Sequence, residues 1–406
     1  MKIDSKTFLK AGVKAEFHRG FHSRALFESV SEVWASDDRF LILCPAGRAD
    51  ISFVDRVSSI EFPARPMFGI FTSGTVSGRP RLVVYSRENI LSSLNAVLGV
   101  FDRSRITSIF SYPQPFHTFG LTLGYLFSVV LDVPLHFHEG KYSSESHAMR
   151  VKLREPGLLT LGTPAHFYDL CRYITQNGTS VTPSYSAILG GASVDLNLWR
   201  DVVSIARIEA PTIGYGCTEA SPAITHLAPG DTPSENAEIG RPLANLTSRV
   251  TASGVEISGP SLCMALIDGD DVTFPSSLVI PDDIRVRDDG KWIFNGRLDL
   301  TLNRGGMKIA LEDVERSLRD QFGLVSIAFA IPSERLGEEL AVVIASEKVS
   351  SEKSDLSDDV RLLISQQFSV RVEPLQISFV SKFPLSESGK IDRKKVRSRF
   401  LEGDAR

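Results

Sequence analysis

The sequence predicts a large N-terminal α/β domain with mostly parallel sheets, residues 1–297, followed by a small α+β domain, residues 298–406. Up to about residue 297, short apolar runs alternate with amphipathic helical patterns, which is typical of β-α units in a parallel sheet. After the segment GRLDL at 296–300, the pattern changes to a compact set of strands and helices. That set has about 100 residues, which is the size of a small domain.

Each part of the large domain has its own pattern. The runs SAILGG (186–191) and VVSIARIEAPTIGYG (202–216) predict strands, and SRENILSSLNAVLGVF (86–101) predicts an amphipathic helix. The longest apolar stretch, Phe119 to Leu131, predicts a buried helix. It is shorter than the roughly 20 residues that cross a bilayer.

The small domain begins with a helix that carries Leu311, Val314, Leu318 and Phe322 on one face. Two strands at 326–332 and 340–346, a helix from about Ser357 and a last strand at 376–383 follow. The polar stretch at 346–359 between them predicts a surface loop. For residues 296–300, a simple hairpin turn is the alternative to a domain boundary.

Composition excludes several classes of function. The formal charge is −4 and the pI is about 6.1. The chain therefore lacks the excess of basic residues by which proteins bind nucleic acids and anionic membrane surfaces. The four cysteines are far apart and form no CxxC pair, which indicates reduced thiols rather than disulfides or a zinc site. The first residues contain no apolar signal-peptide core. We therefore expect a cytoplasmic protein without nucleic-acid or membrane partners.

Two Gly-rich segments have the chemistry of a nucleotide site. FTSGTVSGRPRLV at 71–83 offers hydroxyls, backbone N–H groups and the charges of Arg79 and Arg81 to a polyphosphate, although a solvated turn is the equal alternative. It is not a Walker A loop. GYGCTEASP at 214–222, with GGA upstream at 190–192, allows close backbone approach to a planar ligand. Thr218 and Glu219 can reach phosphate oxygens and Mg²⁺.

Two further segments belong to the small domain. NGRLDLTLNRGGMKIALEDVE at 295–315 places Arg297 and Asp299 before a Gly305–Gly306 turn. FPLSESGKIDRKKV at 383–396 places Lys390 on a Gly-containing turn near the end of the chain. An isolated terminal lysine is usually a solvated charge, so its meaning depends on the other segments.

Taken together, these segments resemble the ANL superfamily of adenylate-forming enzymes, which includes acyl- and aryl-CoA ligases, carrier-protein ligases and peptide-synthetase adenylation domains. The resemblance covers roughly residues 68–398. It follows the order of the family's motifs: the phosphate loop at Thr72–Arg81, PxFHxxGL at Pro115–Leu121, YGxTE at Tyr215–Glu219, GxP at Gly240–Pro242, an approximate GExxxxGP at Gly254–Pro260, the hinge element at Asp289–Asp299, GGxxI at Gly305–Glu315 and GKxDR at Pro384–Arg393.

The resemblance implies the ANL fold and an ATP-dependent ligase that makes an acyl-adenylate and passes the acyl group to a thiol. Thr218, Glu219 and Lys390 would be catalytic, with Glu219 also holding Mg²⁺. The Gly305–Gly306 turn with Lys308 would flank the thiol channel, and the small domain would swing about Asp299. The ATP-binding residues implied are Thr72, Ser73, Gly74, Thr75, Arg81, Gly190, Gly191, Ala192, Gly214, Tyr215, Gly216 and Arg297, with Asp282 or Asp283 on the ribose.

The acid pocket implied by the resemblance contains Phe116, His117, Phe119 and Gly120. His117 is equally well explained as a packed core histidine. Amino-acid-activating relatives carry an aspartate in this segment, so an aryl or acyl acid is favoured over an amino acid. Coenzyme A and the phosphopantetheine of an acyl carrier protein both remain open as acceptors.

Three features depart from the family pattern. The phosphate loop has one extra residue and Arg81 where lysine is usual, the TGD segment reads VIPDDIR, and the chain is short before Thr72. These departures leave open a non-catalytic nucleotide-binding paralogue. The short N-terminal part predicts a trimmed large domain, as a monomer or as a homodimer that covers an exposed sheet edge.

Overall fold

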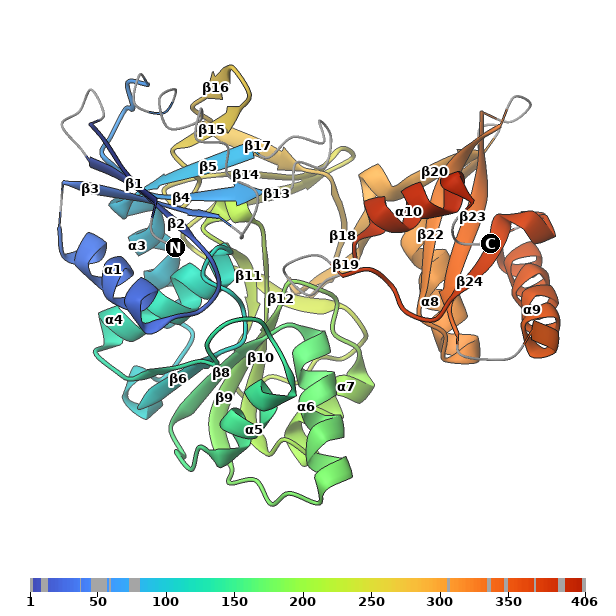
Figure 1. Cartoon of the computed structure of the whole chain (residues 1–406), viewed down its shortest axis with the longest axis horizontal. Helices are drawn as coiled ribbons and strands as arrows, with labels where there is room; N and C mark the ends of the chain where they lie inside the picture. Colours follow the sequence, from blue (N-terminus) through green and yellow to red (C-terminus); the bar gives the residue numbers. More distant parts are fainter. Residues whose placement is uncertain are drawn as a thin grey trace. The chain divides into compact units, whose positions relative to one another are not determined.

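The computed structural model, drawn in Figure 1, describes residues 3–8, 14–36, 38–44, 57, 60–72, 81–304, 307–333, 337–346, 350–368, 370–385 and 391–403. Backbone contacts group the chain into two compact units. Unit 1 comprises Met1–Thr251, Val255–Ile280 and Arg285–Phe294, and unit 2 comprises Ala252–Gly254, Pro281–Ile284 and Asn295–Arg406. The domain boundary predicted after Arg297 lies close to this division.

Unit 1 contains a seven-stranded mixed sheet with the order β1-β2-β3-β4-β5-β15-β16. Its strands are β1 (Ile3–Phe8), β2 (Lys14–Arg19), β3 (Arg39–Cys44), β4 (Pro66–Thr72), β5 (Arg81–Ser86), β15 (Ala265–Asp268) and β16 (Asp271–Thr273). Only β2-β3 and β3-β4 pair in parallel among these neighbours. The central strand β3 reads RFLILC and is buried after its first residue, as expected of a strand covered on both faces.

The second sheet of unit 1 has a parallel centre. Its order is β12-β11-β10-β9-β8-β6-β7, extended past β12 by β19 and β18, where the chain passes to unit 2. The strands are β6 (Ser108–Ser111), β7 (Leu135–His136), β8 (Leu158–Gly162), β9 (Ser184–Gly190), β10 (Ile208–Gly216), β11 (Ala223–Leu227), β12 (Glu238–Pro242), β18 (Asp282–Val286) and β19 (Trp292–Arg297). From β10 to β7 every pairing is parallel, whereas β10-β11 and β11-β12 are antiparallel.

Helices connect and cover these strands (Figure 1). They are α1 (Arg24–Ala35), α3 (Arg87–Leu98), α4 (Phe127–Leu131), α5 (Ser144–Lys152), α6 (Pro164–Asn177) and α7 (Leu196–Ser204). Helix α3 starts at a capping box on Ser86 and contacts β4, β5 and β11, so it packs between the two sheets. The main core of unit 1 therefore lies between them and includes Leu94, Phe116 and Ile188.

The predicted helix at 119–131 is present, but in two parts. Residues Phe119–Leu126 form a π-helix, η2, and α4 follows directly. All but the first residue of η2 are buried. The other short helices of unit 1 are η1 (Arg103–Arg105) and η3 (Thr218–Ala220), and a small third sheet has the order β13 (Thr247–Thr251), β14 (Gly254–Ser258), β17 (Ser277–Ile280).

Unit 2 has a five-stranded sheet with helices. The strands run β21-β20-β23-β22, with β24 paired to β23. The elements are η4 (Leu298–Leu300), β20 (Thr301–Arg304), β21 (Met307–Ala310), α8 (Leu311–Phe322), β22 (Ser326–Ser333), β23 (Gly337–Ala345), α9 (Ser350–Phe368), η5 (Pro374–Gln376), β24 (Ile377–Val380) and α10 (Arg393–Glu402). The predicted face of α8 is confirmed, because Leu311, Val314 and Leu318 are buried and Phe322 packs against the same core.

One predicted boundary is wrong. Helix α9 begins at Ser350, whereas the sequence predicted a surface loop up to residue 359 and a helix from about Ser357. Among the side chains of α9 that the structure describes, the buried ones are Leu356, Val360 and Ile364. Because the first residues of the helix are polar, they carry no apolar periodicity by which to recognise it.

No helix within the described ranges is long and apolar enough to cross a membrane.

Candidate functional site

The segments that the sequence singled out in the large domain lie along one edge of the nine-stranded sheet. Strands β6, β9 and β10 are parallel and end at Ser111, Gly190 and Gly216. The segments Phe116–Gly120, Gly190–Ala192 and Gly214–Glu219 follow these ends or lie on them. In open α/β sheets, ligands bind outside the carboxyl ends of the strands. The topology thus brings the three segments to the place where a ligand is expected.

Glycines lie at the carboxyl ends of the two central strands of this edge, β9 and β10. Gly190 on β9 and Gly214 on β10 are direct neighbours in register. The ring of Phe119 covers Gly190, since a Cβ atom built there would lie 3.2 Å from Phe119 Cε1. Gly216 admits no side chain at all, because its Cβ would lie 1.7 Å from the carbonyl oxygen of Pro222. Tyr215 stands between these glycines, with its ring 6.1 Å from that of Phe294.

The predicted acid-pocket segment is fixed by close packing. Phe116 is 1% exposed and packs edge-on against Phe21 at 5.9 Å. His117 is half-buried beside the Phe116 ring. Gly120 is required sterically, because a Cβ atom there would lie 2.2 Å from the carbonyl oxygen of Gln114. The structure thus places Phe116 in the core and leaves His117 and Phe119 nearer to the sheet edge.

Thr218 and Glu219 lie on η3, which is attached to neighbouring elements through its backbone. The hydroxyl of Tyr85 donates to the carbonyl oxygen of Thr218 at 2.7 Å, and the N–H of Cys263 donates to that of Glu219 at 2.8 Å. Burial raises the pKa of Tyr85 well above its usual value, so the phenol stays a donor. The two side chains of η3 are therefore presented from a fixed backbone.

Glu219 forms an ion pair with Arg81. The contact joins Arg81 Nη2 to Glu219 Oε1, and only 13% of the Glu219 side chain is exposed. Arg81 begins β5, and it pairs in register with Thr72, the last residue of β4. The two ends of the predicted phosphate segment are thus adjacent, and one of them contacts the predicted magnesium ligand.

Several predicted site residues lie outside the described part of the chain. They are Ser73, Gly74, Thr75, Gly305, Gly306 and Lys390, together with the side chains of Thr72, Asp299 and Lys308. The roles assigned to them remain predictions.

In unit 2, Asp282 and Arg297 are close together. Arg297 Nη1 lies 3.8 Å from Asp282 Oδ1, and Asp282 is 6% exposed, whereas Asp283 is exposed. The backbone N–H of Arg297 donates to Glu312 Oε2 at 2.7 Å. Burial raises the pKa of Glu312, although this N–H and the charge of Arg393 oppose the rise. Of the two candidate ribose ligands, Asp282 is the one that the structure brings to Arg297.

The flanks of Lys390 are anchored within unit 2. Leu385 and Ile391 form an antiparallel bridge, and Asp392 caps α10. Arg393 Nη1 donates to Glu315 Oε1 at 2.7 Å, and the same oxygen accepts the N–H of Ala328 at 2.7 Å. This ion pair links the GKxDR segment to α8.

A magnesium ion fits this site only with help from a substrate. Among the described residues, no group of three or more His, Cys, Asp or Glu side chains could hold a metal ion. Mg²⁺ is commonly bound by one or two carboxylates together with substrate phosphates. Glu219, beside the ends of the phosphate segment, is suited to that mode.

Sequence reasoning missed residues that act through tertiary contacts. Tyr85 belongs to an apolar strand with no motif, and its contact with Thr218 is visible only in the fold. His226 is a second case, since it lies on β11 next to Gly214 and outside every motif. No sequence signal distinguishes either residue from an ordinary core residue.

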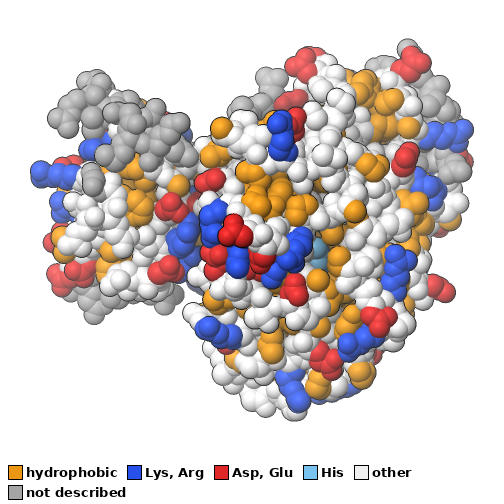
Figure 2. Space-filling view, turned by 180° about the vertical axis from the view of Figure 1, so that it is seen from behind, with side chains coloured by type: hydrophobic (Ala, Val, Ile, Leu, Met, Phe, Trp, Pro, Cys, Tyr) orange, Lys and Arg blue, Asp and Glu red, His pale blue; other side chains and the backbone are white. Residues whose placement is uncertain are grey.

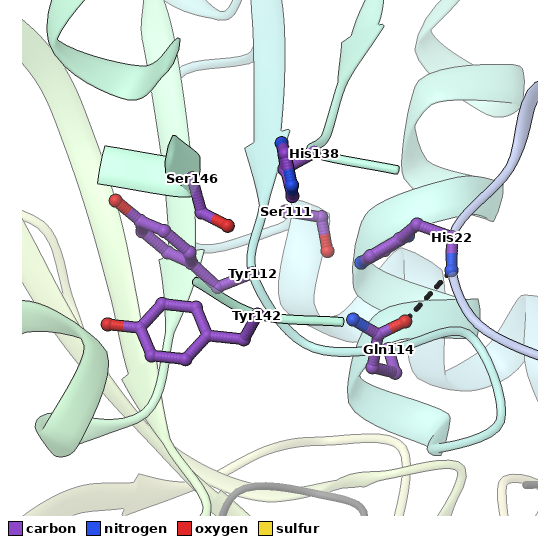
Figure 3. A pocket seen from close by; sticks show the side chains of 7 residues that line it. All are labelled: His22, Ser111, Tyr112, Gln114, His138, Tyr142 and Ser146. Carbon is purple, nitrogen blue, oxygen red and sulfur yellow. Dashed lines mark hydrogen bonds between the residues drawn. The ribbon is translucent and has the colours of Figure 1, made fainter. Parts of the chain in front are cut away.

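A small polar cavity is lined in part by Gln114, which belongs to the loop that leads to Phe116 (Figure 3). It has a volume of about 10 Å³ and is lined by His22, Ser111, Tyr112, Gln114, His138, Tyr142 and Ser146. The backbone N–H of His22 donates to Gln114 Oε1 at 2.9 Å, shown dashed in Figure 3, and Gln114 Nε2 donates to the carbonyl oxygen of Gly140 at 3.3 Å. A cavity of this size holds about one water molecule. The hydrogen bonds of Gln114 fix the loop before Phe116. The cavity itself is too small for a substrate.

On the face drawn in Figure 2, acidic and basic side chains are interspersed and form no large area of one sign. This distribution agrees with the small formal charge of −4.

Comparison with known proteins places this geometry in context. The family model described as "AMP-binding enzyme" matches residues 24–255, more than half of the chain. The mitochondrial medium-chain acyl-CoA ligase of Bos taurus is 24% identical over 357 residues, which are 81% of this chain and 57% of that protein. The oxalate–CoA ligase of Arabidopsis thaliana is 24% identical over 378 residues, 86% of this chain and 71% of that protein. The chain thus spans less than two thirds of the Bos taurus ligase.

Two solved structures have the same fold. The o-succinylbenzoate CoA synthetase of Bacillus subtilis, in complex with its acyl-adenylate intermediate, has a TM-score of 0.73 at 14% identity and covers 94% of this chain and 87% of its own. An anthranilate CoA ligase in complex with anthranoyl-AMP has a TM-score of 0.68 at 16% identity, over 96% of this chain and 79% of its own. These similarities confirm the predicted fold class.

Proposed function

Because the chain belongs to the AMP-binding enzyme family, we propose that it is an ATP-dependent, AMP-forming ligase that joins a carboxylic acid to a thiol. One observation carries the proposal: Arg81, at the end of the phosphate segment, contacts Glu219 at the carboxyl end of β10. This contact joins a residue predicted to bind phosphate to one predicted to bind the metal ion, which supports the proposal. The named relatives are CoA ligases, which supports the same reaction class.

In the proposed first step, the acid's carboxylate attacks the α-phosphate of ATP, so that an acyl-adenylate forms and pyrophosphate leaves. Backbone N–H groups of the phosphate segment and Arg81 would bind the leaving phosphates, and Thr218 would contact the α-phosphate. Bound Mg²⁺ would supply charge neutralisation beside Glu219. Asp282 with Arg297 would bind the ribose, and Lys390 would bridge the carboxylate and the α-phosphate.

In the proposed second step, a thiol attacks the acyl carbonyl carbon and AMP leaves, which gives a thioester. We propose coenzyme A as the thiol, because the relatives reported above are named for coenzyme A. The phosphopantetheine of an acyl carrier protein offers the same chemical group and is the alternative. For the acid, an aryl or acyl group is proposed, since the ring of Phe119 packs against Gly190 and the segment Phe116–Gly120 contains no carboxylate that could pair with the amino group of an amino acid.

The test is pyrophosphate release with MgATP over a panel of aryl, fatty, dicarboxylic and amino acids. We expect turnover with aryl or acyl acids, and we expect Glu219→Gln to slow it about 10²-fold or more because a magnesium-binding charge is lost. Adding coenzyme A or a holo-carrier protein then identifies the acceptor by thioester formation. Efficient use of amino acids alone would contradict the proposed substrate class.

A second candidate, a nucleotide-binding protein without catalysis, is compatible with the same contact. Arg81 engages the carboxylate that Mg²⁺ would need, and in this candidate the ion would not displace it. Measurable ATP binding without pyrophosphate release from any acid would support this candidate and reject the ligase.

A further inference from the structure

His226 lies in one row with the two glycines of the proposed acid site. It is on β11 and pairs in register with Gly214 on β10, which pairs with Gly190 on β9. Paired residues of neighbouring strands project to the same face of a sheet. The imidazole is therefore on the face where Phe119 covers Gly190.

His226 is buried next to an aromatic ring, and Arg241 on the neighbouring strand β12 pairs with it in register. His226 is 4% exposed. The ring of Phe101 packs edge-on against the imidazole, with 5.6 Å between the ring centroids. Neither Nδ1 nor Nε2 has a hydrogen-bond partner among the described residues. Burial lowers the pKa of His226 to about 3, so the ring is neutral at physiological pH.

An imidazole buried in this way is costly for the fold. A buried polar group without a partner loses its hydrogen bonds to water and gains nothing in return. A leucine of similar size would fill the same space without that cost. A partner that arrives with a ligand would explain why a histidine stands at this position.

The imidazole ring packs beside Gly214, whose backbone is partly exposed. A carbon atom at the Cβ position of Gly214 would lie 3.5 Å from His226 Nδ1 and 3.3 Å from Ile188 Cγ2, so these two side chains fill the space next to the glycine. A ligand group that lies against the exposed part of Gly214 is thus adjacent to the ring and to an apolar neighbour. Because residue 214 is glycine, its own side chain does not block this approach.

We propose that His226 selects the acid by a hydrogen bond to an uncharged polar substituent, such as a hydroxyl, carried by the aryl or acyl group. This proposal rests on the ligase function proposed above and narrows its substrate class. A neutral imidazole donates through one nitrogen and accepts through the other, which matches a hydroxyl. A second carboxylate would need a positive charge that this ring does not carry. Arg241, the next residue in the row, has one, but its Nη2 donates to the carbonyl oxygen of Asp289 at 2.9 Å, so we expect dicarboxylic acids not to be the ligands of His226.

The test compares matched acids that differ by one hydroxyl, for example benzoic acid with the three monohydroxybenzoic acids and octanoic acid with hydroxyoctanoic acids. The ratio of kcat/KM values for pyrophosphate release is measured within each pair. We expect wild type to prefer one hydroxylated acid, and His226→Leu to reduce that preference about tenfold while the parent acid is little affected. His226→Gln, which keeps a donor and an acceptor, should retain part of the preference.

Two controls separate selection from a structural role. His166→Leu removes another buried histidine, on α6, and should leave the ratio unchanged. His226→Leu itself should melt no lower than wild type without ligand, because no hydrogen bond of the free protein is lost. A marked fall in its melting temperature, or an unchanged ratio in His226→Leu, would overturn the proposal.

The remaining outcomes are also decisive. Preferred use of dicarboxylic acids with loss of that preference in His226→Leu would overturn the inference of a neutral substituent. If wild type turns over acids and none of the hydroxylated acids is preferred, only the role of His226 fails. If no acid releases pyrophosphate, the ligase function fails, and the role of His226 fails with it.

Discussion

The Arg81–Glu219 ion pair sets a condition on nucleotide binding. Glu219 Oε1 contacts the guanidinium, so a magnesium ion must share the carboxylate with Arg81 or displace it. Only 13% of the Glu219 side chain is exposed, compared with 33% for Arg81. Glu219 is therefore the more constrained partner, and Arg81 both orients it and adds charge at the end of the phosphate segment.

We expect Arg81→Ala to raise the KM for MgATP about tenfold or more, because a hydrogen bond to a charged group contributes about 1.5–3 kcal/mol. Arg81→Lys keeps the charge and loses the planar fork, so its effect should be smaller. Pyrophosphate-release kinetics at varied MgATP measure both. Arg105→Ala, which breaks an exposed pair with Glu209, is the control and should leave the KM unchanged. Equal KM values in all four proteins would contradict a role of Arg81 in nucleotide binding.

For single residues, the sequence predicts those that belong to motifs. It misses those whose importance comes from contacts with residues far away in the chain. Arg81, Thr218 and Glu219 were predicted from local patterns, and the fold brings them to one place. Tyr85 and His226 were not predicted, because their contacts join strands far apart in the chain. A strand residue's partner depends on sheet order, which no local pattern contains.

The π-helix η2 begins within the acid-pocket segment, at Phe119, and its first turn depends on Gly120. A Cβ atom at Gly120 would lie 2.2 Å from the carbonyl oxygen of Gln114 and 2.3 Å from that of Pro113. Backbone atoms cannot move aside without displacing the whole loop. At Gly124 on the same helix, the nearest atom is Ser111 Oγ at 2.9 Å, which belongs to a side chain that can rotate.

We therefore expect Gly120→Ala to lower the free energy of unfolding by about 3 kcal/mol or more, a value typical of severe steric conflict in a core. Gly124→Ala on the same helix should cost only about 1 kcal/mol, because Ser111 can relax. Urea denaturation of the two variants measures the difference. Similar losses for both would show that the close approach to Gln114 and Pro113 does not limit this helix.

The apolar pattern of the sequence predicts the helices better than it predicts their first residues. The sequence predicts helix α8 from four apolar residues at helical spacing, whereas its predicted start of α9 is about two turns too late. The reason is that apolar periodicity reports burial, and the first residues of α9 carry none before Leu356. The π-helical form of η2 had no signal either, since Phe119–Leu131 reads as one continuous apolar run.

For the whole molecule, four buried histidines within the described ranges make stability depend on pH, because burial lowers the pKa of each, His147 included. Burial lowers the pKa of His22, His166 and His226 to about 3, from an ordinary value of 6.5. Between these values each is neutral when folded and protonated when unfolded. The unfolded state then binds more protons, so the free energy of unfolding falls as the pH falls from about 6.5 towards 3. Each histidine contributes about 1.4 kcal/mol per pH unit in that window.

Glu312 and Glu315 act in the opposite direction, because burial raises their pKa values and their contribution is lost as the pH rises. Single variants separate the terms. We expect His22→Phe and His226→Leu each to reduce the slope of unfolding free energy between pH 5 and 6 by about 1.4 kcal/mol per pH unit. Leu98→Ala, a control, should lower stability equally at both pH values. Unchanged slopes in the histidine variants would mean that these residues are protonated in the folded state.

The proposed reaction needs both units, because Thr218 and Glu219 belong to unit 1 and Lys390 belongs to unit 2. If the small unit swings about Asp299, as the family resemblance implies, Lys390 serves only the adenylation step. Arg393, three residues later, donates to Glu315 on α8, so the segment that follows Lys390 is attached to the helices of unit 2.

We expect Lys390→Ala to slow pyrophosphate release about 10²–10³-fold, the usual loss when one positioned electrostatic group is removed. Thioester formation from a supplied acyl-adenylate and coenzyme A should stay close to the wild-type rate, because that step has no α-phosphate attack to assist. Lys395→Ala, an exposed lysine on α10, is the matched control and should affect neither step. Equal losses in both steps would show that Lys390 supports the fold of unit 2 or acts throughout the cycle, and the alternation of the two units would lose its main support.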